Sequence, residues 1–282
     1  MNSDLNTAKR NLTIQPNLDR RQALQTVCAF SAAVVGSKFA IADQSNVGKG
    51  ITEIRMKSAR IDELRRFYEA SLELPVALSD DTLTVEAGKT RLIFSQTESS
   101  EDEPFYHFAF NIPENKIESA REWQRQRTPL LRRGSKEVIH FKGINAHSVY
   151  FNDPAGNIVE YIARHDLNNS AEGQFGPNQI LYASEIGLVV DDVAQTQRNI
   201  KDALGLTGFP GSFRSQSFSP VGDAHALLIL VKRDRKWFPN NKQAAKVHPV
   251  HATLHGSMRS QLDNRELDYR VDLAPGIVHS RE

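Results

Sequence analysis

Hydrophobic and polar residues alternate with a period of two at residues 53–56 and again at residues 185–188. Each alternating segment is followed by a stretch in which apolar residues recur every three or four positions, at residues 61–74 and 193–206. Strict alternation is typical of a β-strand, and the longer spacing is typical of an amphipathic helix. The two copies match without a gap at an offset of 132 residues, so the chain contains a repeated strand–helix unit.

Further alternating segments follow each predicted helix, at residues 82–86 and 91–94 in the first copy and at residues 226–231 in the second. Each unit is therefore predicted to be a βαβ arrangement with additional strands. A degenerate unit follows the second copy, with predicted strands at residues 251–255 and 267–271. Too few residues separate these two strands for the usual helix.

Another complete unit lies between the two copies. It opens with a predicted strand at residues 107–111, followed by a predicted helix that carries Ile117, Ala120 and Trp123 and by a strand-like segment at residues 138–141. It closes with two strands, at residues 148–151 and 158–162, on either side of Asn-Asp-Pro-Ala-Gly-Asn. Proline supplies a fixed φ and glycine supplies a positive φ, as a tight connection requires. We therefore expect a β-hairpin at the end of this unit.

The N-terminal segment has a different pattern. An Arg20-Arg21 pair precedes an apolar run over residues 23–42, which ends in the small-x-small pattern Ala40-Ile41-Ala42. This segment resembles a bacterial twin-arginine signal. The resemblance implies an export signal over residues 1–42, a linker over residues 43–50, and a periplasmic or secreted protein with no stable membrane anchor after cleavage. The alternative is an amphipathic or core helix at the N-terminus of a cytoplasmic protein.

Charge and cysteine content restrict the possible chemistry. The chain carries 35 Lys and Arg against 34 Asp and Glu, a net charge of +1, so no overall field attracts nucleic acid. Its hydrophobic content of 39% is that of a globular protein and excludes disorder. A single cysteine, Cys28, permits neither an internal disulfide nor a cluster of thiolate ligands. A metal ion would need His, Asp or Glu ligands.

Three short motifs resemble the vicinal oxygen chelate superfamily, which includes glyoxalase I, extradiol dioxygenases and bleomycin-resistance proteins. They are Phe67-Tyr68-Glu69, the His-x-Ala-Phe that begins at His107, and Tyr-Phe-x-Asp-Pro-x-Gly-Asn-x-x-Glu from Tyr150 to Glu160. The resemblance covers about residues 51–256. It implies an α+β fold in which tandem βαβββ modules pair into open barrels. The concave face of such a barrel would hold a divalent metal ion.

The repeat pattern also divides the chain. The expected first domain, residues 51–165, holds two modules, and residues 166–179 form a linker rich in Asn, Gly and Ser. The expected second domain, residues 180–282, holds one full and one degenerate module. Because the last module lacks its helix and the Asp-Pro-x-Gly turn, we expect one competent metal site per chain.

The resemblance places His107 and Glu160 at the first-strand and last-strand ligand positions of the second module. Glu53 and Glu185 fall at the first-strand positions of the first and third modules, and His251 falls at that of the fourth. If the first two modules pair, Glu53 completes the site. If the second and third modules pair, Glu185 completes it instead.

A set of one histidine and two glutamates can bind Zn, Mn, Fe, Ni or Co and leave positions open for two substrate oxygens. In glyoxalase-type chemistry, a ligand such as Glu160 or Glu185 can also remove the proton beside a carbonyl group. The resemblance therefore implies a lyase or isomerase that acts on a small molecule with vicinal oxygens, as a monomer or homodimer. Two alternatives are an extradiol dioxygenase, which needs a second histidine, and a metal-free binding or resistance protein.

Two other clusters allow more than one interpretation. His248, His251 and His255 have the spacing of a helical zinc site, but Pro249 and the alternation of residues 250–255 favour a strand. In a strand, His251 and His255 lie about 13 Å apart and cannot share one ion. Trp237 and Phe238, with Lys232 and Arg233 close by in the sequence, wall a pocket, receive an anion or cover the core.

Overall fold

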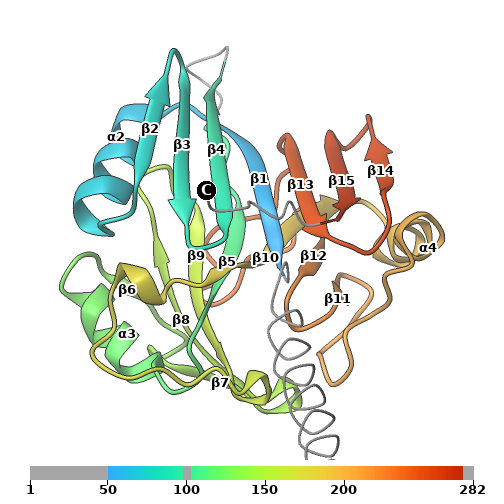
Figure 1. Ribbon diagram of the computed structural model, residues 1–282. Helices are drawn as coiled ribbons and strands as arrows, with labels where there is room; N and C mark the ends of the chain where they lie inside the picture. The colour runs from blue at the N-terminus through green and yellow to red at the C-terminus, as the bar shows by residue number, and fades with distance from the viewer. Residues whose placement is uncertain (1–49, 98–102, 276–282) are drawn as a thin grey trace, which may run out of the picture. The chain divides into compact units, whose positions relative to one another are not determined.

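The computed structural model describes residues 50–97 and 103–275, coloured in Figure 1. The predicted export signal at residues 1–42 lies outside the described residues. The described strands are β1 (Ile51–Ser58), β2 (Val76–Ser79), β3 (Thr82–Ala87), β4 (Thr90–Gln96), β5 (His107–Ile112), β6 (Leu130–Leu131), β7 (Ile139–Phe141), β8 (Ala146–Asn152), β9 (Ile158–Arg164), β10 (Tyr182–Val190), β11 (Phe218–Gly222), β12 (Leu227–Lys232), β13 (Val250–His255), β14 (Ser260–Asn264) and β15 (Tyr269–Ala274). All of them join one continuous sheet.

The helices are few and short. They are α2 (Ile61–Arg66), continued by the π-helical turn η1 (Phe67–Ser71), α3 (Ile117–Arg125) and α4 (Val193–Leu204), with short 3-10 turns η2 (Lys142–Ile144), η3 (His165–Leu167) and η4 (Pro177–Gln179). Figure 1 shows α2, α3 and α4 at the periphery of the strands. None of the helices among the described residues is long and apolar enough to cross a lipid bilayer.

The sheet is built from the four predicted modules, which begin at β1, β5, β10 and β13. In each module the first strand lies parallel to the last, so that β1 pairs with β4, β5 with β9, β10 with β12 and β13 with β15. The modules then join through antiparallel pairs of first strands, β5 with β10 and β1 with β13. The second module therefore pairs with the third, and the first with the fourth.

This pairing crosses the predicted linker at residues 166–179. Strands from both sides of these residues pair with one another. The division of the chain into two domains at that point stays a prediction. The fourth module contains strand β14 and no helix between β13 and β15 in the part of the chain that the structure describes, in agreement with the short spacing in the sequence. Strands β2, β6, β11 and β14 are additions to the predicted elements.

Helix α4 shows how the sequence sets the limits of an element. The side chain of Asp192 accepts a hydrogen bond from the backbone N–H of Gln195 at 2.8 Å and caps the first turn. Val193, Ile200 and Leu204 lie on the buried face. The helix stops two residues before its predicted end, because Gly205 adopts a left-handed conformation with φ of 70°.

Asp153 organises the hairpin turn between β8 and β9. Its carboxylate accepts hydrogen bonds from the backbone N–H groups of Ala155 and Asn157, from the Asn157 side chain and from the Tyr68 hydroxyl, at 2.8–3.0 Å. The Asn157 side-chain oxygen accepts in turn from the backbone N–H of Tyr106 at 2.8 Å. The turn therefore fixes the starts of β5 and β9, which carry His107 and Glu160.

We predict that Asp153→Ala lowers the free energy of unfolding by about 3 kcal/mol, because four donors lose a buried acceptor. Asp202→Ala, on the exposed face of α4, should change it by less than about 0.5 kcal/mol. Urea titration followed by circular dichroism measures both variants. Equal effects of the two substitutions would contradict a structural role for Asp153.

Candidate functional site

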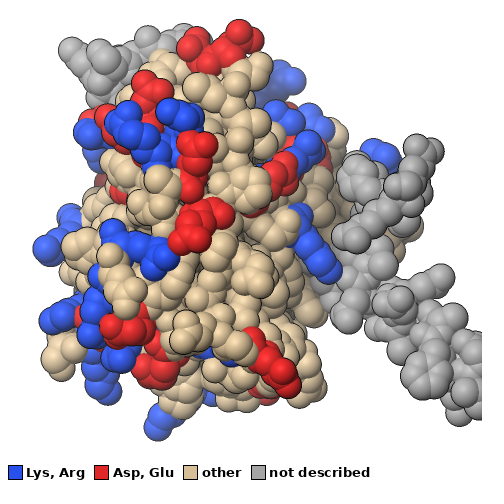
Figure 2. All heavy atoms as spheres, turned by 60° about the vertical axis from the view of Figure 1, so that its left-hand side comes forward, with Lys and Arg blue, Asp and Glu red and all other residues tan. Residues whose placement is uncertain are grey.

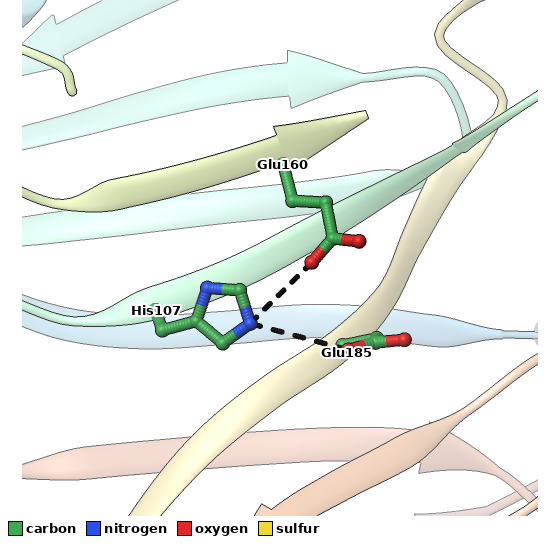
Figure 3. Close-up of side chains that lie close together, drawn as sticks. All are labelled: His107, Glu160 and Glu185. Atoms are coloured by element: carbon green, nitrogen blue, oxygen red, sulfur yellow. Dashed lines mark ion pairs between the residues drawn. The ribbon is translucent and has the colours of Figure 1, made fainter. Parts of the chain in front are cut away.

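Three of the predicted ligands meet on one face of the sheet, as Figure 3 shows. Strand β5 lies between β9 and β10, and Ala109 of β5 is in register with Glu160 on one side and with Glu185 on the other. The Nε2 atom of His107 lies 3.6 Å from Oε2 of Glu160 and 4.0 Å from Oε2 of Glu185. All three side chains are buried.

The hydrogen bonds fix the protonation of His107. Its Nδ1 lies 3.0 Å from the carbonyl oxygen of Ile158, so Nδ1–H donates to that carbonyl and the Nε2 lone pair faces the two carboxylates. Burial lowers the pKa of His107, although Glu185 opposes the shift, and the ring is neutral at pH 7. Burial raises the pKa of Glu160 well above its usual range, and the nearby Glu185 charge raises it further.

This arrangement fits a divalent metal ion. Three acceptor atoms converge, and separations of 3.6 and 4.0 Å are too long for hydrogen bonds. Ligand atoms that share an ion at about 2.1 Å lie roughly 3–3.5 Å apart, so the observed spacing is slightly wider than a filled site. His107, Glu160 and Glu185 are the one group of this kind found among the described residues.

Arg164 is a part of the site that the sequence interpretation missed. It lies on β9, four residues beyond Glu160 and on the same face, and it is fully buried. One terminal nitrogen donates to Oε1 of Glu185, and Nε lies 3.3 Å from the side-chain oxygen of Asn111. Glu185 therefore gives one oxygen to Arg164 and turns the other toward His107. The sequence contains one indication of this role. Arg164 follows Glu160 by four residues in an otherwise largely apolar strand, so its side chain is expected on the same face.

Glu53 occupies the same first-strand position in the first module but lies in a different environment. Its two carboxylate oxygens each accept a hydrogen bond at 2.6 Å, one from Arg55 and one from Arg91. His251, the corresponding residue of the fourth module, contacts Asp272 at 2.8 Å. The structure thus brings Glu185 to His107 and directs Glu53 to two arginines.

Strand register also identifies the position where a fourth protein ligand would stand. Glu160 pairs with Ala109 between β5 and β9, and Ile229 pairs with Gly187 in the equivalent place between β10 and β12. Ile229 lines the same pocket as Glu160 and offers no donor atom. Three protein ligands would therefore leave coordination positions open for a bound molecule.

The three residues line a cavity of about 630 Å³, which is the size of a small-molecule site. Aromatic side chains dominate its walls: Phe141, Tyr150, Phe209, Phe213, Phe218, Trp237 and Phe238. The Trp237 ring centre lies 5.3 Å from that of His107. Trp237 and Phe238 thus wall the pocket, which was one of the interpretations of that cluster.

Two loops meet beside the cavity at a pair of glycines. Gly143, in η2 of the second module, and Gly211, in the third module, both line the pocket. A Cβ atom added to either would overlap with the carbonyl group of the other. Gly211 also has a φ of 72°, a conformation that side chains other than glycine rarely adopt. The absence of side chains here lets the two loops touch.

We predict that Gly211→Ala lowers the free energy of unfolding by about 3 kcal/mol, from left-handed strain plus overlap with Gly143. Gly134 is the matched control, because its φ is 61° and no atom lies within 4 Å of an added Cβ. Gly134→Ala should therefore cost about 1 kcal/mol, the strain alone. Urea titration compares the two variants, and equal losses would show that the contact between the loops contributes nothing.

The module order, the parallel pairing of first and last strands, and the joined first strands define the glyoxalase-like fold of the vicinal oxygen chelate type. The chain aligns with the structure named "putative dioxygenase" from Bacillus subtilis at 15% identity and a TM-score of 0.53, over 82% of this chain and 86% of that one. A V278E mutant of glyoxalase I from Zea mays aligns at 13% identity and a TM-score of 0.48, over 84% and 96%.

No protein-family model and no curated protein sequence matches the chain. At 15% identity, the similarity to the Bacillus subtilis structure establishes the fold alone. The chemistry therefore has to be argued from the residues of the pocket.

Proposed function

We propose that this protein is a divalent-metal-dependent lyase or isomerase that acts on a small molecule with two vicinal oxygens. The observation that carries the proposal is the convergence of His107, Glu160 and Glu185 in the wall of a pocket. A bound Zn, Mn, Fe, Ni or Co ion would polarise the substrate oxygens and stabilise the negative charge that develops on them.

The two carboxylates are suited to different roles. Arg164 donates a hydrogen bond to one oxygen of Glu185 and so holds that carboxylate in a fixed orientation. Glu160 has no arginine within hydrogen-bond distance among the described residues, and burial raises the pKa of its carboxyl group. We therefore assign Glu160 as the base that accepts a proton from the carbon beside the substrate carbonyl.

The surrounding side chains assist this step. The Ile158 carbonyl holds the His107 ring in one tautomer, and aromatic side chains line the pocket around it. Tyr150, in register with Glu160 across β8 and β9, is buried, and burial together with the Glu160 charge raises its pKa so that the hydroxyl stays protonated. The Tyr150 hydroxyl therefore remains a hydrogen-bond donor beside Glu160.

Proton exchange tests the proposed function without knowledge of the natural substrate. Purified protein loaded with Zn, Mn, Ni or Co is incubated in D₂O with hydroxyacetone or with the glutathione hemithioacetal of methylglyoxal, and deuterium incorporation is followed by NMR. We expect exchange at the carbon beside the carbonyl that disappears with a chelator and in Glu160→Gln. Metal uptake without exchange of any probe would contradict an isomerase.

A second candidate is a ring-cleaving dioxygenase, because the Bacillus subtilis structure of the same fold is named as a dioxygenase. The ligand set of one histidine and two glutamates differs from the two histidines and one carboxylate typical of non-haem iron oxygenases. Oxygen consumption with catechol and Fe(II) would favour this candidate. Ligand binding with neither metal uptake nor turnover would identify a binding protein instead.

The site of action is a separate part of the proposal. We propose export to the periplasm or the exterior, on the strength of the arginine pair and apolar run in residues 20–42. A reporter fused after residue 50 should be exported from a bacterial cell, and Arg20→Lys/Arg21→Lys should retain it in the cytoplasm. A reporter that stays inside with the unchanged segment would support the cytoplasmic alternative.

A further inference from the structure

Three cationic side chains line the pocket without an acidic partner. Arg133 lies between β6 and β7, Lys142 lies in η2, and Arg235 follows β12. Among the described residues, none of the three forms an ion pair with Asp or Glu, and the Arg235 guanidinium donates a hydrogen bond to the Lys236 carbonyl, at 3.4 Å. Three separate segments thus bring positive charge to one cavity.

This lack of partners contrasts with other arginines of the same protein. Arg60, Arg233 and Arg270 each form an ion pair with a carboxylate, and basic and acidic side chains lie intermixed over the face that Figure 2 shows. Surface charge in this chain is commonly compensated by a neighbour. The three cations of the pocket are therefore available to a bound molecule.

The two arginines are also held in place by aromatic rings of the pocket. The Arg133 guanidinium carbon lies 5.3 Å from the centre of the Phe238 ring, and that of Arg235 lies 4.9 Å from the centre of the Phe218 ring. Such contacts position a guanidinium group without neutralising it. Arg235 is half-buried, and a partly desolvated cation gains most from an anion that replaces its lost water.

The negatively charged side chains of the cavity lie at the candidate metal site. Glu160 and Glu185 stand beside His107, and Arg164 already compensates one of them. Lining cations therefore outnumber lining carboxylates by three to two, and a bound divalent ion would make the pocket more positive. An uncharged apolar molecule would leave this excess uncompensated.

We propose that the pocket selects a small molecule that joins a flat apolar body to a negatively charged group, held by Arg133, Lys142 and Arg235. The position of its oxygens beside His107 rests on the proposed function, whereas the selection for an anion does not. The chemical class is an aromatic or similarly apolar carboxylate, sulfonate or phosphate.

Two fluorescent probes with one ring system test the selection for charge. 8-Anilino-1-naphthalenesulfonate carries a sulfonate, and N-phenyl-1-naphthylamine lacks it. Both are titrated into the protein in the presence of a chelator, so that the result is independent of metal binding. We expect the sulfonate to bind at least about 10-fold more tightly, with an affinity that falls as salt rises.

Substitution of the cationic residues tests whether they cause the preference for the charged probe. Arg133→Gln/Arg235→Gln should weaken binding of the sulfonate by about 10-fold and change binding of the uncharged probe by less than about 2-fold. Arg66→Gln, at an exposed position of α2, is the control and should leave both affinities unchanged. Because Arg133 and Lys142 are exposed, Arg133→Gln/Lys142→Gln serves as a second double variant if the first unfolds.

Equal affinity for the two probes would overturn the inference, as would equal losses in the pocket variants and in Arg66→Gln. Failure of the metal-dependent exchange experiment would leave these titrations unaffected. Conversely, a protein that exchanges protons but does not distinguish the probes would retain the proposed function and lose the inference about its substrate.

Discussion

We expect Glu185→Gln to weaken binding of a divalent ion by at least about 100-fold and Glu53→Gln to leave it unchanged. Loss of a group that only orients a ligand already costs about 10- to 100-fold, so loss of a charged ligand costs more. Glu185 points one oxygen at His107 Nε2, 4.0 Å away, whereas both oxygens of Glu53 are bound by Arg55 and Arg91.

Calorimetric titration with Zn, Mn or Ni at pH 7 measures the affinities of the unmodified protein and of both variants. The comparison is well matched, because Glu53 and Glu185 hold the same position in the first strands of repeated modules. Elemental analysis should give one equivalent of metal per chain. Two equivalents, or equal losses from the two substitutions, would contradict a single site at His107, Glu160 and Glu185.

The features that the sequence predicts well depend on residues close together in the chain. The Asp-Pro-x-Gly-Asn turn predicts the hairpin of β8 and β9, and Gly156 has the expected positive φ, of 82°. The alternating segment at residues 107–111 lies in β5, with His107 at its first position. Periodicity and turn chemistry depend on neighbouring residues, so the tertiary structure does not alter the prediction made from them.

The choice between Glu53 and Glu185 is not local. It depends on which first strands pair, and the side chains of β1, β5 and β10 are all compatible with antiparallel neighbours. The outcome is set by packing between segments more than 70 residues apart, such as Ala109 beside Glu185. A single sequence therefore leaves both pairings open.

Arg164, Arg133 and Arg235 were missed for a related reason. The sequence interpretation treats a charged residue as solvated unless it belongs to a motif. Arg164 is buried because β9 is covered on both faces, and Arg133 and Arg235 share a cavity because the second and third modules pair. The roles of these arginines depend on how the modules pair, and the sequence around each arginine does not reveal that pairing.

Arg164→Met should lower the free energy of unfolding of the metal-free protein by about 3–5 kcal/mol, the usual cost of leaving a buried charge without its partner. Arg164 is 2% exposed, and it donates to Glu185, which is itself 7% exposed. Without the guanidinium group, Glu160 and Glu185 would form an uncompensated pair of buried acids. Urea titration in the presence of a chelator measures the loss.

Two further measurements separate charge compensation from simple packing. In Arg164→Met/Glu185→Leu both partners are replaced by apolar groups, so this double variant should recover at least about 2 kcal/mol of the loss. A saturating divalent ion should raise the stability of Arg164→Met more than that of the unmodified protein, because the ion supplies the missing positive charge beside Glu185. If the double variant were less stable than Arg164→Met, and metal stabilised both proteins equally, Arg164 would act as a packing residue. Recovery in both measurements would instead mean that the arginine holds the empty site together until the ion binds.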